Sequence, residues 1–409
     1  MKKRIVCFGL GEIYETFLEL YDDSKAEIIA LSDNAPAKWT QPGVIEPSKI
    51  KELEFDHIVI TSGYFREIKE QLCGYGIGES CILNFYDVYQ NLIVKRGHAV
   101  LDLLKDNVPV SHEYKQELRE LKCIGEKNLF LNARIHAGAV RDKRLRSLEE
   151  AEFQVYSQFG EDGIIQWLIH NVAIDSRTFI EFGVEDYTEA NTRFLLMNDN
   201  WTGLVMDGSE ANMRRLNSWE YLWKYDLTAV AAFITKDNIN RLILDAGFEG
   251  DVGILSIDLD GNDWWILNAI ECVTPRILIC EYNNIFGEEK KVTVPYDAGF
   301  ARTEKHYSNL YWGCSIAAFR GWAQENGYYY MGSNSAGNNA FFVRKDCMEP
   351  EKVPADADVF VEGRYRESRD EMGNLTYLKG TDRLKCIRAM EVFEIENGCT
   401  DTIANIYHI

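Results

Sequence analysis

Apolar runs alternate with helix-length amphipathic segments along most of the chain. Near the start, strand-like runs at 4–8, 27–34 and 57–63 are separated by segments long enough for one helix each. This β-α-β-α-β order is typical of a parallel, doubly wound sheet with right-handed crossovers. We expect a Rossmann-like domain of the nucleotide-binding type here.

The same alternation begins again near residue 151. Five apolar runs each end in polar or acidic residues, at 178–187, 203–210, 229–238, 252–261 and 276–284. Helix-length segments separate them, which predicts a second parallel sheet whose ligand-binding edge lies at the carboxyl ends of its strands. Two more β-rich runs within 328–346 surround the turn Ser-Ala-Gly-Asn and indicate a hairpin that finishes this sheet.

The length of 409 residues exceeds the size at which one hydrophobic core stops growing. We therefore expect an α/β protein with two Rossmann-like domains, at 1–95 and 151–350. Charged helical patterns at 96–150 predict a connector that also offers a surface for self-association as a homo-oligomer. The charged, turn-rich extension 351–409 is expected to form either a lid or an oligomer contact.

The composition limits the kinds of partner that this protein is expected to bind. The net charge of −21 would repel a phosphate backbone, so nucleic acid is not expected as a partner. No apolar stretch approaches the roughly 20 residues that span a bilayer, and the first residues are too polar for a signal peptide. The ten cysteines are scattered singly, without the spacing of a zinc or redox motif. We expect a cytoplasmic protein with reduced cysteines and no membrane span.

The first domain carries a partial dinucleotide motif. Gly9 and Gly11 follow the first strand and Asp33 ends the second, where glycines admit a pyrophosphate and an acid holds a ribose. Tyr14 stands in place of the third glycine, which disfavours NAD. A nucleotide-sugar, another ligand or a scaffold without a ligand stay open. The segment 1–95 resembles small Rossmann domains attached to sugar-modifying transferases and acyltransferases.

The second domain carries a more specific set of motifs, FIEFGVEDY, LVMDGS, LSIDLDGNDWWIL and ICEYNN, at four of its strand ends. In order and spacing they resemble those of FkbM-like methyltransferases, a family associated with glycan and natural-product tailoring. The resemblance covers 151–346 and implies a Rossmann-like methyltransferase that uses S-adenosylmethionine (SAM). Val184, Glu185 and Asp186 depart from the small residues usual in the first motif.

Several residues are candidates for contact with SAM. Asp207, at the end of the second run, would accept hydrogen bonds from the ribose hydroxyls, or alternatively cap the next helix. Gly208 and Ser209 follow it in the same motif. Glu181 and Gly183 would face the methionine part, where an acid pairs with the amino group and a glycine permits close backbone approach.

Two further segments contribute candidates for the cofactor site. Phe233, Ile234 and Thr235, at the end of the third run, would form the adenine pocket or belong to the ordinary core. The segment before the first run forms a helix N-terminus or, as the family resemblance implies, approaches the cofactor. Its candidate residues are Gln158, Glu161 and Asp162.

The catalytic candidates lie in the acidic end of the fourth run. Asp258 and Asp260 are two apart on an extended segment and so project to the same side, where repulsion raises the pKa of one of them. Such a group suits a general base that deprotonates a sugar hydroxyl. Alternatively, Asp258 and Asp260 with Glu281 or Asn283 would hold Mg²⁺. Glu281 and Asn283 are also candidates for acceptor binding, and Asp263 for a helix cap.

Other candidates lie between the fifth run and the hairpin. His306 is an alternative base because its ordinary pKa lies near neutrality. Tyr307, Tyr311 and Trp312 offer flat faces that stack on sugar rings, although aromatic clusters more often form core. Asn334, next to the hairpin turn, completes the expected acceptor contacts.

The sequence thus favours a SAM-dependent O-methyltransferase acting on a sugar, nucleotide-sugar or glycan hydroxyl. Two alternatives use the first domain instead: an NAD(P)-dependent oxidoreductase, and a non-catalytic protein that binds nucleotide-sugars.

Overall fold

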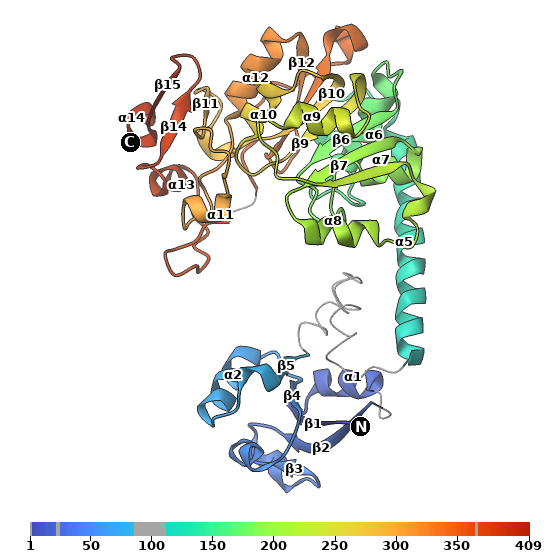
Figure 1. The fold of residues 1–409 in the computed structure, drawn as a ribbon, viewed down its shortest axis with the longest axis vertical. Coiled ribbons are helices and arrows are strands. Elements are labelled where there is room, and N and C mark those ends of the chain that lie inside the picture. The colour runs from blue at the N-terminus through green and yellow to red at the C-terminus, as the bar shows by residue number, and fades with distance from the viewer. Residues whose placement is uncertain (1, 22–24, 86–111, 365–366) are drawn as a thin grey trace. The chain divides into compact units, whose positions relative to one another are not determined.

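The computed structural model describes residues 2–21, 25–85, 112–364 and 367–409 (Figure 1). The chain divides into two compact units, Met1–Asn128 and Leu129–Ile409, and the boundary falls within the long helix α5 (His112–Val140). Residues 96–111 of the expected connector lie outside the described residues. Self-association through the connector stays a prediction. None of the described helices has the length and apolar character that a membrane span requires.

The first unit contains a parallel five-stranded sheet with strand order β3-β2-β1-β4-β5. Its strands are β1 (Lys3–Phe8), β2 (Ala26–Ser32), β3 (Val44–Ile45), β4 (His57–Ile60) and β5 (Ile82–Asn84), and its helices are α1 (Glu12–Leu20) and α2 (Phe65–Gly74). The apolar residues of β1 and β4 are fully buried, as expected for central strands covered on both faces. The predicted Rossmann-like sheet is confirmed.

The second unit contains a seven-stranded sheet with strand order β12-β13-β10-β9-β6-β7-β8. Its strands are β6 (Thr178–Phe182), β7 (Thr202–Asp207), β8 (Leu227–Ala231), β9 (Gly250–Ile257), β10 (Val273–Glu281), β12 (Tyr328–Ser333) and β13 (Asn339–Arg344). β6 to β10 run parallel, and β13 pairs antiparallel with both β10 and β12. A parallel sheet finished by a hairpin is the strand plan of Rossmann-like SAM-dependent methyltransferases, as the sequence predicted.

Alternating side chains on the central strands supply two separate cores. Phe179 on β6 and Ile254 on β9 belong to one buried cluster, and their neighbours Ile180 and Leu255 belong to the other. Each such side chain stabilises the fold by roughly 1.5–3 kcal/mol when fully buried. The flanking helices are α6 (Glu161–Asn171), α7 (Arg193–Asp199), α8 (Glu210–Asn217), α9 (Ile239–Asp245), α10 (Asp263–Ala269) and α12 (Ile316–Glu325).

The five parallel strands end earlier than the apolar runs suggested. β8 ends at Ala231, and the residues up to Asn238, expected to continue the strand, form a loop that leads into α9. The other runs likewise continue into loops after β6, β7, β9 and β10. Glu181, Asp207 and Glu281 still belong to their strands, whereas Glu185, Asp258 and Asp260 lie in the loops that follow, where backbone direction is not held by strand pairing.

The residues after 350 belong to the second unit. β14 (Glu391–Glu394) pairs antiparallel with β15 (Cys399–Thr402) and with β11 (Val292–Thr293), which forms a separate three-stranded sheet. The helices α13 (Thr381–Cys386) and α14 (Ile403–Tyr407) contribute Leu384 and Ile403 to a buried cluster with Trp312. This extension therefore shares a core with the segment that follows β10.

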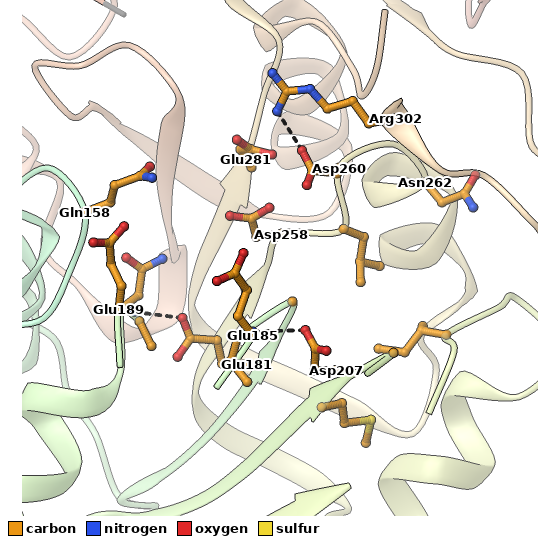
Figure 2. Close-up of a pocket in the computed structure, with 18 of the residues that line it drawn as sticks. Gln158, Glu181, Glu185, Glu189, Asp207, Asp258, Asp260, Asn262, Glu281 and Arg302 are labelled. Carbon is orange, nitrogen blue, oxygen red and sulfur yellow. Dashed lines mark hydrogen bonds and ion pairs between the residues drawn. The ribbon is translucent and has the colours of Figure 1, made fainter. Parts of the chain in front are cut away.

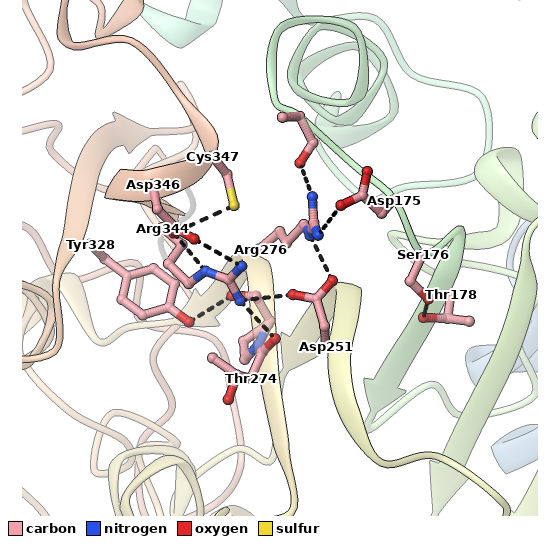
Figure 3. Close-up of polar contacts among 12 residues, drawn as sticks. Asp175, Ser176, Thr178, Asp251, Thr274, Arg276, Tyr328, Arg344, Asp346 and Cys347 are labelled. Atoms are coloured by element: carbon pink, nitrogen blue, oxygen red, sulfur yellow. Dashed lines mark hydrogen bonds and ion pairs between the residues drawn. The ribbon is translucent and has the colours of Figure 1, made fainter.

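At the amino ends of β9 and β10, a charged network joins distant segments (Figure 3). The Arg276 guanidinium lies 2.7 Å from the Asp251 carboxylate and 2.6 Å from that of Asp175, and also donates to the Ala173 carbonyl at 2.6 Å. Arg344 on β13 binds the other oxygen of Asp251 at 2.8 Å. Arg276 is only 9% exposed, whereas the Asp175 side chain is 87% exposed, so a buried guanidinium joins the buried edge of the sheet to a carboxylate at the surface.

Arg276→Ala should lower the free energy of unfolding by roughly 3 kcal/mol, because it removes three charge-assisted hydrogen bonds made by one buried guanidinium. Urea denaturation followed by circular dichroism measures this loss. The control is Arg364→Ala, which breaks an exposed ion pair with Glu149 and should cost about 1 kcal/mol or less. Equal losses in both variants would contradict a stabilising role for the network.

Candidate functional site

A cavity of about 650 Å³ lies at the carboxyl ends of the parallel strands in the second unit (Figure 2). Glu181 comes from β6, Asp207 from β7, Asp258 from the loop after β9 and Glu281 from β10. The volume is within the range of small-molecule sites, roughly 300–1,000 Å³. The described lining residues include eight carboxyl groups: Glu181, Glu185, Glu189, Asp207, Asp258, Asp260, Glu281 and Glu367.

The cavity depends on a close backbone contact beneath it. Gly183 has φ +73°, and a Cβ built on it would lie 1.7 Å from the carbonyl oxygen of Asp258. Only glycine lets the loops after β6 and β9 approach so closely. Glu185 and Asp260, one in each loop, adopt left-handed conformations with φ 48° and 51°. Such residues cost on the order of 1–3 kcal/mol each and are typical of functional sites.

Asp207 lines the cavity with its carboxylate held by backbone N–H groups. The Glu185 N–H donates to Oδ2 at 2.9 Å and the Ser209 N–H donates to Oδ1 at 2.7 Å. The Asn212 amide adds a third, longer hydrogen bond to Oδ1 at 3.5 Å. A carboxylate accepts about four hydrogen bonds, so Asp207 keeps capacity for a ligand hydroxyl such as that of a ribose. Gly208 also lines the cavity, whereas Ser209 caps α8 by accepting from the Asn212 N–H at 3.3 Å.

Glu181 lines the cavity but is already bound by its own chain. Its carboxylate accepts from the Asn191 N–H at 2.8 Å, the Thr192 N–H at 3.0 Å and the Thr192 hydroxyl at 2.5 Å. Burial raises the pKa of Glu181 to about 7 in spite of these bonds. Its clearest role is to hold the start of α7 against the cavity, with little capacity left for a cofactor amino group.

Asp258 is paired with Glu281, and not with Asp260 as the sequence suggested. A hydrogen bond joins the Asp258 and Glu281 carboxyl groups, and burial followed by mutual repulsion with nearby acids raises the pKa of both. The Asp260 carboxylate instead binds Arg302 at 2.8 Å. The two-residue spacing misleads because Asp260 has a left-handed φ, so the chain is no longer extended and side chains no longer alternate.

The arrangement also bears on the expected magnesium site. Among the described residues, no group of three His, Cys, Asp or Glu side chains is arranged to hold a metal ion. Asp260, one of the proposed ligands, is committed to Arg302. A magnesium ion between Asp258 and Glu281 therefore stays a prediction, without a third acid to complete it.

Three expected site residues are built into the surrounding protein instead of the cavity. The Asn283 amide donates to the carbonyls of Leu310 and Trp312, and the Tyr311 hydroxyl donates to the Glu391 carbonyl at 2.5 Å. The His306 ring lies 2.7 Å from the Ser308 hydroxyl, and burial lowers the pKa of His306. We therefore correct the acceptor role of Asn283 and Tyr311 and drop His306 as the base.

The segment before β6 supports the cavity from behind. Asp162 accepts from the N–H groups of three successive residues, 155 to 157, which fixes the loop that brings Gln158 to the cavity wall. Burial raises the pKa of Asp162 to about 6. Glu161 accepts from the Asn334 amide at 2.6 Å and the Asn339 amide at 2.8 Å. Asn339 lines the cavity, so Glu161, Asp162 and Asn334 position the wall without forming it.

Of the three residues expected to form the adenine pocket, two line the cavity and one does not. Phe233 and Ile234 line the cavity, and Phe233 is 53% exposed. The Thr235 N–H donates to the Asn238 side chain at 2.8 Å, so Thr235 belongs to the turn before α9 and is not among the described lining residues. Asp263 is the first residue of α10 and accepts from the N–H groups of Leu259 and Gly261, so it closes the turn before the helix; the N-cap of α10 is Asn262 and not Asp263.

Sequence reasoning missed several lining residues. Arg302 and Glu367 reach the cavity from segments far from any strand end, and no local pattern marks them. Glu189, Asn262 and Asn338 lie in loops whose path depends on tertiary contacts. Glu185 stands in the first motif where small residues are usual. This departure was the one sign in the sequence that Glu185 lines the cavity.

The partial dinucleotide motif of the first unit is bound by groups of its own chain. The Asp33 carboxylate accepts from the Leu10 and Ala35 N–H groups and lies 2.7 Å from the Lys38 ammonium. A Cβ on Gly9 would lie 2.9 Å from Ser62, so this glycine serves the packing of two loops. Gly11 precedes α1 as its N-cap, with nothing close to it. Asp33 thus locks its own turn, which does not favour the oxidoreductase alternative.

Part of the chain matches a known family, and part of it is similar to solved structures. Residues 1–83 match a family described as C2185-like, N-terminal. No curated protein sequence matches the chain. Among solved structures, it is similar to a SAM-dependent methyltransferase from Clostridium acetobutylicum, with 8% identity, 45% of this chain and 90% of that chain covered, and a TM-score of 0.30.

Two other solved structures are similar over the same architecture. An O-methyltransferase from Bacillus cereus, in complex with S-adenosylhomocysteine (SAH), has 12% identity, 53% and 89% coverage of this and that chain, and a TM-score of 0.27. A methyltransferase FkbM from Methylobacillus flagellatus has 12% identity, 68% and 79% coverage, and a TM-score of 0.20. At such low TM-scores, these similarities carry no conclusion about substrate or site residues.

Gly183→Ala should lower the free energy of unfolding by roughly 4 kcal/mol or prevent folding, because its Cβ would meet a backbone carbonyl that cannot move aside. The matched control is Gly247→Ala, which has φ +87° but no atom within 4 Å of the new Cβ. It should cost only the left-handed strain, about 1–2 kcal/mol. Urea denaturation of both variants separates clash from strain, and equal losses would contradict the close contact.

Proposed function

We propose that this protein is a SAM-dependent O-methyltransferase whose acceptor is a sugar-type hydroxyl. The observation that carries the proposal is the convergence of Asp207, Asp258 and Glu281 on one cavity, at the carboxyl ends of a sheet with the methyltransferase strand plan. In such sheets, ligands bind in the crevice outside the strand carboxyl ends.

The residues present fit the cofactor in charge and in size. SAM carries a sulfonium and an ammonium group against one carboxylate, and the cavity offers eight carboxyl groups. Asp207 would hold the ribose hydroxyls, and Phe233 with Ile234 would cover the adenine. When bound, SAM supplies a methyl group that is already activated for transfer.

Asp258 and Glu281 would remove the proton from the acceptor hydroxyl. A hydroxyl becomes a competent nucleophile as its proton leaves, and Asp258 is the acid next to which such a hydroxyl would lie. Its raised pKa, caused first by burial, makes it a stronger base than an ordinary aspartate once it is ionised. Glu281 positions that proton through its hydrogen bond with Asp258. Catalysis would otherwise rest on alignment of the two reactants.

Asp207→Ala should weaken SAH binding by about tenfold or more, equivalent to about 1.4 kcal/mol, because it removes the acceptor for both ribose hydroxyls. Isothermal titration calorimetry with SAH measures the change. Glu325→Gln removes an equal charge from an exposed position outside the cavity and should leave the affinity unchanged. Unchanged affinity in Asp207→Ala would exclude the ribose role.

Asp258→Asn should keep SAH affinity within about threefold and reduce methyl transfer by about 100-fold or more, since a general base typically contributes 10²–10⁴-fold. In the wild type, transfer should increase with pH in a range above that of an ordinary aspartate, because a base acts only when deprotonated and burial raises the pKa of Asp258. The Asn variant should lose this dependence. Transfer of labelled methyl from SAM to a panel of monosaccharides provides the readout, and an unaltered pH profile would contradict the assignment.

A further inference from the structure

We propose that the acceptor carries a protonated amine, as an amino sugar does, and that this ammonium group binds at Glu281 beside Asp258. The inference rests on the proposed function, since it assumes a cofactor in the part of the cavity near Asp207. It concerns the part near β10, where Glu281 and Asp258 form the wall (Figure 2).

The first observation is an imbalance of charge. Arg302 is the single basic residue among the described lining residues, against eight acids. Its charge is already matched, since it lies 2.8 Å from Asp260 and 3.6 Å from Glu367. A cofactor with one net positive charge would offset only part of the charge on the other lining acids. Burial raises the pKa of Glu181, Asp258 and Glu281, so protons neutralise part of this charge, but no basic group of the described lining is left to attract an anion. A ligand next to the cofactor therefore meets a wall of carboxyl groups that favours cations over anions.

The second observation is an unsatisfied atom. Glu281 is only 7% exposed, and its Oε2 has no hydrogen-bond partner in the described structure. A buried acceptor without a partner costs on the order of 1–3 kcal/mol, and more when charged, so this position is built for a donor that the chain does not supply. The other partner of this group is Asp258, through the shared hydrogen bond.

An ammonium group would both balance the excess of acids and supply a donor for Glu281 Oε2. It donates up to three hydrogen bonds and brings the positive charge that lets Asp258 and Glu281 ionise together. A neutral hydroxyl would satisfy Oε2 but would leave the two acids in repulsion. With Glu281 engaged by the amine, Asp258 remains available for the proton of the reacting hydroxyl.

The same charges disfavour phosphate. A nucleotide-sugar would bring its pyrophosphate close to Glu281, Glu189 and Asp258, without an unmatched basic residue among the described lining residues to hold it. We therefore narrow the acceptors expected from the sequence to amine-bearing sugars and exclude the phosphorylated ones.

Three probes that share one ring test the proposal: glucosamine, glucose and glucose 6-phosphate, which are cationic, neutral and anionic at neutral pH. Each is titrated by calorimetry into the full chain saturated with SAH. We expect glucosamine to bind about tenfold or more tightly than glucose, with glucose 6-phosphate weakest. The preference should decrease as salt is added, because part of it is electrostatic.

Glu281→Gln keeps the shape of the side chain and should abolish the preference for glucosamine while SAH binds as before. Glu325→Gln is the charge-matched surface control and should retain the preference. Equal binding of glucosamine and glucose, a preference for glucose 6-phosphate, or a response to Mg²⁺ but to none of the sugars would each overturn the proposal. If SAH itself does not bind, the proposed function fails first, which separates the two failures.

Discussion

The contact between Gly183 and the Asp258 carbonyl is the constraint on which the site depends. Because no side chain stands between the loops after β6 and β9, these loops lie against each other at the sheet edge. That approach brings the cofactor-side acids and the acceptor-side acids into one cavity instead of two. It also forces the chain to turn sharply on both sides, which explains why Glu185 and Asp260 occupy left-handed conformations there.

The acids of the cavity divide into those that hold the protein together and those that are available to ligands. Glu181 is used up by the start of α7, and Asp260 by Arg302. Asp207 is oriented by two backbone groups and keeps free lone pairs, while Glu281 keeps one oxygen without a partner. Carboxylates of the first kind make the cavity rigid, so that those of the second kind meet a ligand without rearrangement.

Much of the fold could be predicted from the sequence, because apolar periodicity reports burial directly. The five parallel strands of the second unit, its hairpin and three strands of the first-unit sheet were visible as apolar runs, whereas the short strands β3 and β5 were not predicted. Site residues within strands or next to them, such as Asp207 and Glu281, could be found in the same way. The prediction that Asp258 and Asp260 point to the same side was wrong, because Asp260 has a positive φ and the chain is not extended there. Arg302 and Glu367 were invisible because tertiary packing alone brings them to the cavity.

The extension after residue 350 adds a wall that the sheet alone does not provide. Glu367 lies 3.6 Å from Arg302, which in turn holds Asp260, so one guanidinium connects this extension to the loop after β9. A second cavity of about 320 Å³ shares all three residues with the first. Substrate groups that reach beyond the acid pair would therefore meet the extension and not the sheet. Under the proposed function, the sheet edge would set the geometry of methyl transfer, and the extension would determine the preference among larger acceptors.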